Sequence, residues 1–410
     1  MISSPPITKI QPKIRFNIFN SNWETVSLQD LTNIVGRIGY RGYTVADIVP
    51  KGKGAITISP SNIVDSKVDF NKCTYISFDK YEESPEIKIY DGDIIFVKTG
   101  STLGKTAYVR GLKEKATLNP QLVVLKNISI DNTFLFYRML STDFRKNVVM
   151  IAVGGAIPTL SQVALGKIVF RIPSEEEQQK IASFFSSIDE WIENLVRQKL
   201  ALVRYKKGMT QKIFLQVIRF KDDNGKDFPE WEERKAGDIF ENYVNKNHNG
   251  DLPLLAVTQD KGVVYRDELD LKIHSSEEGI KNYKIIEPNN FVISLRSFQG
   301  GIEHSKIKGI SSPAYTVLKN KIQINTDFYR ILFKKESFIN KLNSLIYGIR
   351  DGKQISYNEF KTMILPYPSI TEQKKIADFL LSIDDLIEAK KSQLKKAEQW
   401  KKGLIQKLFI

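Results

Sequence analysis

The chain contains one long segment twice. Residues 173–215, which begin Pro-Ser-Glu-Glu-Glu-Gln-Gln-Lys-Ile-Ala, return without a gap at residues 368–410, which begin Pro-Ser-Ile-Thr-Glu-Gln-Lys-Lys-Ile-Ala. About twenty of the roughly forty-three aligned positions are identical. A long segment copied in each half of a chain predicts two domains in equivalent places around a pseudo-two-fold axis. Such an arrangement suits the recognition of two sites on one elongated partner.

Each copy carries the signals of a long amphipathic helix. Ser174 with Glu177, and Ser369 with Glu372, have the spacing of a capping box, in which the hydroxyl accepts from a free backbone N–H and the glutamate reaches back. Apolar residues then recur in steps of four and three, which is the heptad pattern of a coiled coil. This pattern includes Ile181, Phe185, Ile188, Ile192 and Leu195 in the first copy, and Ile376, Leu380, Ile383, Ile387 and Leu394 in the second.

A helix of about forty residues is about 60 Å long, and its narrow apolar stripe needs a partner. We therefore expect residues 173–218 and 368–410 to form two helices that pack antiparallel, because each follows a domain. Lysines interrupt both stripes at equivalent positions, and they predict incomplete packing at Lys206 and Lys401. Gly208 and Gly403 also match, so either the helices end or bend there or another backbone approaches closely.

The apolar and basic surface left over on these helices predicts a docking site for partner helices. The alternative is a plain intramolecular strut.

The remaining segments, 1–172 and 219–367, are predicted to be two domains. Both are rich in β-branched and aromatic residues with frequent Gly, Asn and Pro, which is typical of mixed domains of short strands and a few helices. They share faint similarities: Trp23-Glu24 with Trp231-Glu232, residues 119–126 with 312–319, and residues 136–140 with 328–332. Elsewhere they diverge. The predicted fold class is therefore α+β, with two mixed domains separated by two long antiparallel coiled-coil helices in an internal pseudo-two-fold repeat.

Charge and cysteine content restrict the classes of function. The chain has 61 Lys and Arg against 47 Asp and Glu, a net charge of +14, which indicates a polyanionic partner. The alternative is a solvated lysine-rich surface, and charge alone does not choose between them. A lone cysteine, Cys73, cannot form an internal disulfide and suits a reducing compartment. Neither a membrane span nor a signal peptide is evident, so we expect a cytoplasmic protein without membrane contact.

Residues 99–106, Thr-Gly-Ser-Thr-Leu-Gly-Lys-Thr, resemble a phosphate-binding loop, but only three residues separate the glycines where that motif needs four. We predict instead a loop whose backbone and side chains approach DNA phosphates and base edges. The candidates in the first domain are Lys98, Thr99, Ser101, Thr102 and Lys105. The equivalent region of the second domain offers Arg296, Ser297 and Gln299 and has no Gly-Lys-Thr.

Further clusters combine basic, amide and aromatic side chains with glycine, as groove contacts require. They are Arg37, Arg41 and Tyr43, then Lys51 and Lys53, and, in the second domain, Arg350, Lys353 and Gln354. The alternative for any one of them is an ordinary solvated loop.

Enzymatic sites find little support. His248, His274 and His304 are scattered without the spacing of metal ligands, so we predict neither a catalytic nor a metal site. The stretch 230–235, Glu-Trp-Glu-Glu-Arg-Lys, superficially matches a nuclease Glu-x-Lys but lies beside a polar linker and is interpreted as solvated charge.

The whole chain resembles the specificity subunits of Type I restriction-modification systems, the HsdS family. The similarity is carried by Pro-Ser with Glu-Gln and Ile-Ala at 173–182 and 368–377, and by the shared Lys-Lys-Gly and Gln-Lys-hydrophobic-Phe endings. The loop of Gly100-Ser101 and Gly104-Lys105 looks like a common feature of that family's target-recognition domains.

The resemblance implies two target-recognition domains, each recognising one half of a split, asymmetric sequence in double-stranded DNA. It also implies assembly with two modification subunits that bring S-adenosylmethionine and methylate adenine, and with restriction subunits that use ATP and Mg²⁺. The family's specificity subunit is itself non-catalytic and holds no cofactor. Half-sites about 34 Å apart would place both domains on one face of a duplex.

Three alternatives stay open at this stage. One is an enzyme with a site in a variable domain, such as a nuclease or methyltransferase. Another is a coiled-coil adaptor without sequence-specific DNA binding. The third is a specificity subunit of a related Type II-like system with a bipartite site.

Overall fold

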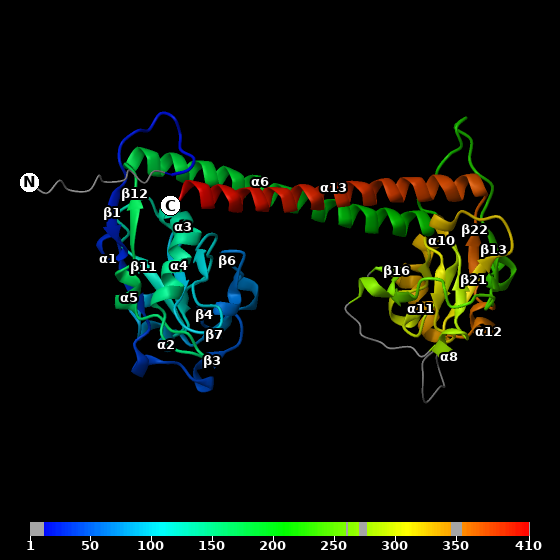
Figure 1. Cartoon of the computed structure of the whole chain (residues 1–410), viewed down its shortest axis with the longest axis horizontal. Coiled ribbons are helices and arrows are strands. Elements are labelled where there is room, and N and C mark those ends of the chain that lie inside the picture. Colours follow the sequence, from blue (N-terminus) through cyan, green and yellow to red (C-terminus); the bar gives the residue numbers. More distant parts are fainter. Residues whose placement is uncertain (1–11, 260, 270–276, 346–354, 410) are drawn as a thin grey trace, which may run out of the picture. The chain divides into compact units, whose positions relative to one another are not determined.

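The computed structural model describes residues 12–259, 261–269, 277–345 and 355–409. The chain forms two compact units, Met1–Lys199 with Lys390–Ile410, and Leu200–Ala389 (Figure 1). Each unit holds one mixed domain together with part of each long helix. Among the described residues, none of the helices is both long and apolar enough to cross a membrane.

The first unit is built on an antiparallel sheet with the strand order β2-β11-β8-β9. Its strands are β2 (Asn33–Gly36), β11 (Leu122–Lys126), β8 (Ile94–Val97) and β9 (Thr106–Tyr108). Both central strands are apolar at almost every position because both faces of the sheet are covered. Ile94 and Phe96 of β8 point into a core shared with the helices, whereas Ile95 and Val97 point into a core shared with a second sheet.

The second sheet of this unit has the order β10-β4-β7-β3, in which β10 and β4 are parallel and the other pairs antiparallel. These strands are β10 (Ala116–Leu118), β4 (Ala55–Ile58), β7 (Thr74–Ile76) and β3 (Ile48–Val49), and a short hairpin joins β5 (Ile63–Val64) to β6 (Lys67–Val68).

Helices and one further strand pair complete the first unit. The helices are α1 (Leu28–Leu31), α2 (Phe78–Glu82), α3 (Asn132–Met139), α4 (Thr142–Ile151) and α5 (Gln162–Gly166). Strand β1 (Glu24–Ser27) pairs antiparallel with β12 (Val169–Ile172), which leads into the first long helix.

The second unit repeats this plan. Its sheet has the antiparallel order β14-β21-β18-β19, with β14 (Phe240–Asn242), β21 (Thr316–Asn320), β18 (Phe291–Ile293) and β19 (Glu303–His304). Strand β13 (Glu232–Lys235) pairs with β22 (Ile364–Tyr367), as β1 pairs with β12. The helices are α7 (Ala236–Ile239), α8 (Glu277–Ile280), α9 (Ser297–Gly300), α10 (Thr326–Phe333), α11 (Glu336–Ser344) and α12 (Tyr357–Phe360). The sequence similarities at 119–126 and 136–140 therefore mark equivalent elements, β11 with β21 and α3 with α10.

The two units differ in what covers the outer face of the sheet. In place of the second four-stranded sheet, the second unit has two described strand pairs, β15 (Leu255–Thr258) with β16 (Gly262–Tyr265), and β17 (Lys284–Ile286) with β20 (Gly309–Ser311). The shared scaffold thus carries dissimilar outer layers.

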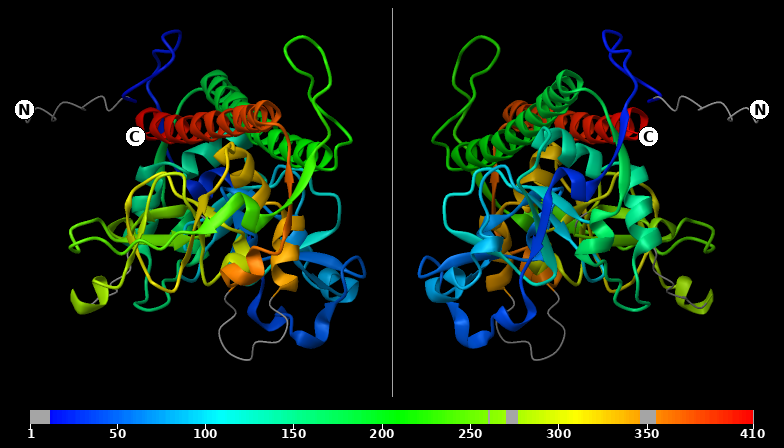
Figure 2. Two further views of the ribbon diagram at one scale, coloured as in Figure 1. Left: turned by 90° about the vertical axis from the view of Figure 1, so that its right-hand side faces the viewer. Right: turned by 90° about the vertical axis from the view of Figure 1, so that its left-hand side faces the viewer.

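The long helices are α6 (Glu175–Phe214) and α13 (Ile370–Leu408). Within the first unit they run antiparallel, since Phe185 stacks on Phe409 at 6.2 Å while Trp191, further along α6, meets Trp400 edge-on at 6.4 Å (Figure 1, Figure 2). The start of the predicted coiled-coil stripe has a second partner, because Phe185 also contacts Tyr137 of α3. The first turns of each long helix therefore pack into the core of a domain, and the later turns pack against the other long helix.

The two lysines that interrupt the apolar stripes form ion pairs between the helices, and incomplete packing beside them stays a prediction. Lys206 binds Asp384 at 2.6 Å in the second unit, and Lys401 binds Asp189 at 2.5 Å in the first. Each lysine thus finds a carboxylate on the opposite helix. Within the part of the chain that the structure describes, no other backbone approaches the matched glycines: a Cβ at Gly208 or Gly403 would meet nothing within 4 Å, and both helices continue past them.

The predicted capping boxes are confirmed only in part: Ser369 Oγ accepts from Glu372 N–H at 3.3 Å, but the glutamate carboxylates bind elsewhere. The carboxylate of Glu177 is fully buried and accepts from Nε and Nη2 of Arg15, at 2.8 and 2.6 Å. In the second unit Glu372 accepts from Nε and Nη2 of Arg219, at 3.3 and 3.1 Å. The glutamates anchor the segments that lead into each domain instead of reaching back to their own helix, and this ion pair raises the pKa of both arginines.

We expect Arg15→Met and Arg219→Met each to lower the free energy of unfolding of their unit by about 1–3 kcal/mol, because each leaves a buried carboxylate without its donors. Thermal unfolding of the full chain measures both. Lys67→Met is the control, since its bond to Glu193 joins two half-exposed side chains and should contribute about 0.5 kcal/mol or less. If all three variants unfold at the same temperature, the buried arginine–glutamate pairs do not stabilise their units.

Candidate nucleic-acid interface

The glycine-rich segment of the first domain is the turn between β8 and β9. Gly100 and Gly104 both have positive φ, +106° and +86°, which non-glycine residues rarely adopt. The turn is closed by Gly104 N–H donating to Val97 O at 3.0 Å, and by Val97 N–H donating to Lys105 O at 2.8 Å. Because the loop leads into a strand, it lacks the helix N-terminus that a nucleotide phosphate loop provides.

The predicted residues of this loop differ in exposure. Ser101 and Lys105 are exposed, whereas Lys98, Thr99 and Thr102 are half-buried. Burial lowers the pKa of Lys98. Ser101 and Lys105 therefore present the reachable polar groups of the loop.

In the second domain the equivalent connection runs from β18 to β19 through α9. Arg296 and Gln299 are exposed there, and Nε2 of Gln259 donates to Arg296 O at 3.1 Å. Ser297 is buried, and its hydroxyl accepts from Ser294 N–H at 2.8 Å. The prediction of a DNA contact by Ser297 was wrong, because its hydroxyl shapes the turn from inside.

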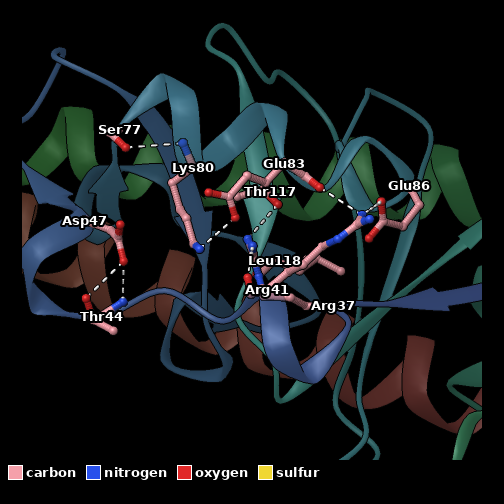
Figure 3. Close-up of polar contacts among 10 residues, drawn as sticks. All are labelled: Arg37, Arg41, Thr44, Asp47, Ser77, Lys80, Glu83, Glu86, Thr117 and Leu118. Atoms are coloured by element: carbon pink, nitrogen blue, oxygen red, sulfur yellow. Dashed lines mark hydrogen bonds and ion pairs between the residues drawn. The ribbon is translucent and has the colours of Figure 1, made fainter.

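Arg37 is likewise a structural residue and not a surface contact. Its side chain is only 5% exposed, and it donates to Leu118 O at 3.1 Å, to Thr117 Oγ1 at 3.1 Å and to Arg41 O at 3.2 Å (Figure 3). Burial lowers the pKa of this guanidinium. The predicted base contact by Arg37 is therefore corrected: it ties its loop to β10.

Arg41 and Tyr43 remain at the surface but are engaged within the domain. Arg41 donates to Glu83 O at 2.9 Å and lies 3.6 Å from the Glu86 carboxylate (Figure 3). The hydroxyl of Tyr43 accepts from Asn119 Nδ2 at 2.9 Å. Both side chains are half-exposed, so they hold the loop in shape while keeping one side in solvent.

Lys51 and Lys53 are exposed on either side of Gly52, whose φ of +79° makes the tight turn before β4. The three candidates Arg350, Lys353 and Gln354 lie outside the described residues.

The residues of the predicted coiled-coil stripe, which were also candidates for partner binding, are mostly inside the protein. Ile181, Phe185, Ile188, Leu195, Ile376, Leu380 and Ile383 are buried, and Ile192, Ile387 and Leu394 are half-buried. Sequence reasoning missed the side chains that do reach the surface. In the first unit these are Trp191 and Trp400, 46% and 50% exposed, next to a groove of about 340 Å³ lined by Trp191, Asn194, Leu195, Gln198, Lys390, Gln393 and Lys396. Assigning every residue of the two helices to a heptad position, and so to the inner or the outer face, would have identified Trp191 and Trp400 as exposed.

Comparison with known proteins decides the family. Residues 20–204 and 229–399 match the family described as the Type I restriction modification DNA specificity domain. The chain belongs to this family. The family domain occurs twice, once in each unit, in agreement with the repeated strand order and the duplicated helix.

Relatives and solved structures agree with this assignment. The chain is 26% identical to the putative type I restriction enzyme MjaX specificity subunit of Methanocaldococcus jannaschii, over 95% of this chain and 93% of the relative. It is 27% identical to the MjaVIII specificity subunit of the same organism, over 79% and 80%. In fold it is similar to the Type I restriction-modification S subunit from M. genitalium, with a TM-score of 0.54 and 17% identity over 98% and 99% of the chains. This Type I specificity subunit therefore has two target-recognition domains.

Because Arg37 ties its loop to β10, Arg37→Met should lower the free energy of unfolding by about 1–3 kcal/mol. Lys51→Met, at an exposed position of the same domain, should change it by about 0.5 kcal/mol at most. Thermal unfolding of the full chain compares the two. If Arg37→Met unfolds at the same temperature as Lys51→Met, Arg37 is not the anchor that its contacts indicate.

Proposed function

We propose that this chain gives a Type I restriction-modification complex its DNA specificity, with each target-recognition domain recognising one half of a bipartite, asymmetric target. The observation that carries the proposal is that the two domains have the same strand order, β2-β11-β8-β9 in the first and β14-β21-β18-β19 in the second. The loops that connect these strands differ in sequence between the two domains. A common scaffold holds equivalent loops, and their different side chains give two different half-sites.

In this proposal the exposed cations set the position on the duplex, and polar side chains discriminate bases. Lys51, Lys53 and Lys105 are exposed in the first domain and contact phosphates. Arg296 and Gln299, three residues apart and both exposed in the second domain, are of the residue types that pair with guanine and adenine edges.

The proposal assigns assembly to the outer faces of the long helices. Trp191 and Trp400 lie edge to face beside the groove of the first unit, and large exposed aromatic residues are typical energetic centres of protein interfaces. The occupant that we propose is a helix of a modification subunit. Restriction subunits join the same complex.

We further propose that the chain is non-catalytic. The chemistry comes from its partners: S-adenosylmethionine is bound by the modification subunits, and ATP with Mg²⁺ by the restriction subunits. The loop that most resembles a nucleotide site leads into β9, which favours DNA contact over nucleotide binding.

Replacing residues 14–172 with the corresponding domain of another family member should change one half of the target and leave the other half unchanged. Single-molecule methylation mapping of DNA from cells that carry the complex measures both halves together. The reciprocal replacement of residues 219–367 is the control and should change the other half. A change in both halves on either replacement would contradict independent recognition, and no sequence-selective methylation at all would favour an adaptor role.

The double variant Trp191→Ala/Trp400→Ala should weaken association with the modification subunits by at least about tenfold, because each truncation removes a large exposed aromatic contact. Co-purification and analytical ultracentrifugation of the assembled complex measure it. Phe78→Ala is a matched control, since Phe78 is also 46% exposed but lies in the recognition domain. If the double variant assembles as the wild type does, the groove is not part of the interface with the modification subunits.

A further inference from the structure

An exposed apolar patch lies at the end of α4 and in the segment after it. Its members are Val149, Met150, Ile151, Val153 and Ile157, which are 72%, 78%, 39%, 70% and 66% exposed. Single apolar side chains are common on protein surfaces, but five within nine residues are typical of an interaction site. We call these five residues the apolar tip.

The segment has a defined shape. Val153 N–H donates to Thr159 O at 3.0 Å, and Thr159 N–H donates to Val153 O at 2.8 Å, so residues 153–159 form a closed turn. Gly154 has a φ of +102°, and a Cβ there would lie 2.8 Å from Ile157 O. The turn therefore presents Val153 and Ile157 without a large ordering cost on binding.

This turn is joined to the glycine-rich loop of the candidate interface. Gly100 N–H donates to Pro158 O at 3.0 Å, and Leu160 N–H donates to Lys98 O at 2.8 Å. Thr99 and Thr159 form a β-bridge between the two segments. The apolar tip and the exposed Ser101 and Lys105 thus lie on two segments that backbone hydrogen bonds hold together.

The charge around the apolar tip is positive. Arg145 and Lys146 of α4 are exposed just before it, and Lys105 is exposed on the adjoining loop. Between residues 141 and 167 the sole acidic residue is Asp143, which pairs with Arg138 at 2.7 Å. An apolar patch surrounded by cations is complementary to a polyanion that also carries apolar groups.

Duplex DNA offers such groups in its major groove, where thymine alone of the four unmodified bases presents a methyl group. We propose that Val153 and Ile157 recognise thymine methyl groups in the half-site of the first domain, while Ser101 and Lys105 bind the neighbouring backbone. The inference rests on the proposed DNA specificity of this domain and assigns the apolar part of its base recognition.

The test uses the assembled complex and duplexes carrying its mapped target, with the half-site of the first domain identified by the domain replacement. Each thymine of that half-site is replaced in turn by deoxyuridine, which lacks the methyl group. For the wild type we expect about a fourfold loss of affinity at one or more of these positions, the equivalent of one buried methyl group. Replacements in the other half-site serve as an internal reference.

The double variant Val153→Ser/Ile157→Ser should bind the thymine duplex more weakly and show no further loss on deoxyuridine replacement. Ile18→Ser/Val217→Ser is the matched control, because those side chains are 76% and 70% exposed and belong neither to the apolar tip nor to the glycine-rich loop. Ile18 precedes β1 and Val217 follows α6, and this variant should behave as the wild type.

Three results would overturn the inference. The first is a wild type indifferent to every deoxyuridine. The second is a Val153/Ile157 variant that keeps the wild-type response. The third is a Val153/Ile157 variant that no longer binds the modification subunits but keeps its preference for thymine over deoxyuridine. That result would make the apolar tip a contact with protein and not with DNA. If the complex binds no bipartite target at all, the result contradicts the proposed function and not only this inference.

Discussion

Within each unit, the antiparallel pairing of α6 with α13 is the constraint on which the rest of the structure depends, and the distribution of charge favours it. Residues 175–193 of α6 carry six acidic residues and one basic residue, whereas residues 194–214 carry six basic and no acidic residues. The second helix has the same polarity, with seven basic residues and one acidic residue between 389 and 408. Antiparallel packing sets acidic halves against basic halves, as in the pairs Lys206–Asp384 and Lys401–Asp189. Parallel packing would oppose like charges.

The duplication extends to the joints between helix and domain. Gln178 donates to Pro173 O at 2.9 Å and accepts from Asp131 N–H at 3.3 Å, while Gln373 donates to Pro368 O at 2.8 Å and accepts from Asn325 N–H at 2.9 Å. With the arginine–glutamate anchors, these bonds fix each helix to its own domain in the same way, at the start of α3 and at the start of α10. The loops above the sheets are not constrained by these joints, so their side chains can differ without disturbing the frame.

Much of the frame could be predicted from the sequence, because the duplicated helices leave a strong periodic signal and the composition of the two domains is typical of short strands. The missed features depend on contacts between distant residues. Nothing local shows that Glu177 binds Arg15, 162 positions earlier, or that Lys206 meets Asp384. The residues of the candidate DNA interface were harder to predict than the frame. An arginine beside glycine and tyrosine suggests a surface loop, yet burial of Arg37 follows from β10, whose position the local sequence does not reveal. Whether the exposed candidates contact DNA stays a prediction.

Single-molecule methylation mapping of host DNA, with and without this chain beside its modification subunits, tests the central claim most directly. Recognition by two dissimilar domains predicts one split motif, with two unlike halves around an unspecified spacer, methylated only when the chain is present. A methylation pattern that is independent of the chain, or a single uninterrupted motif, would contradict it.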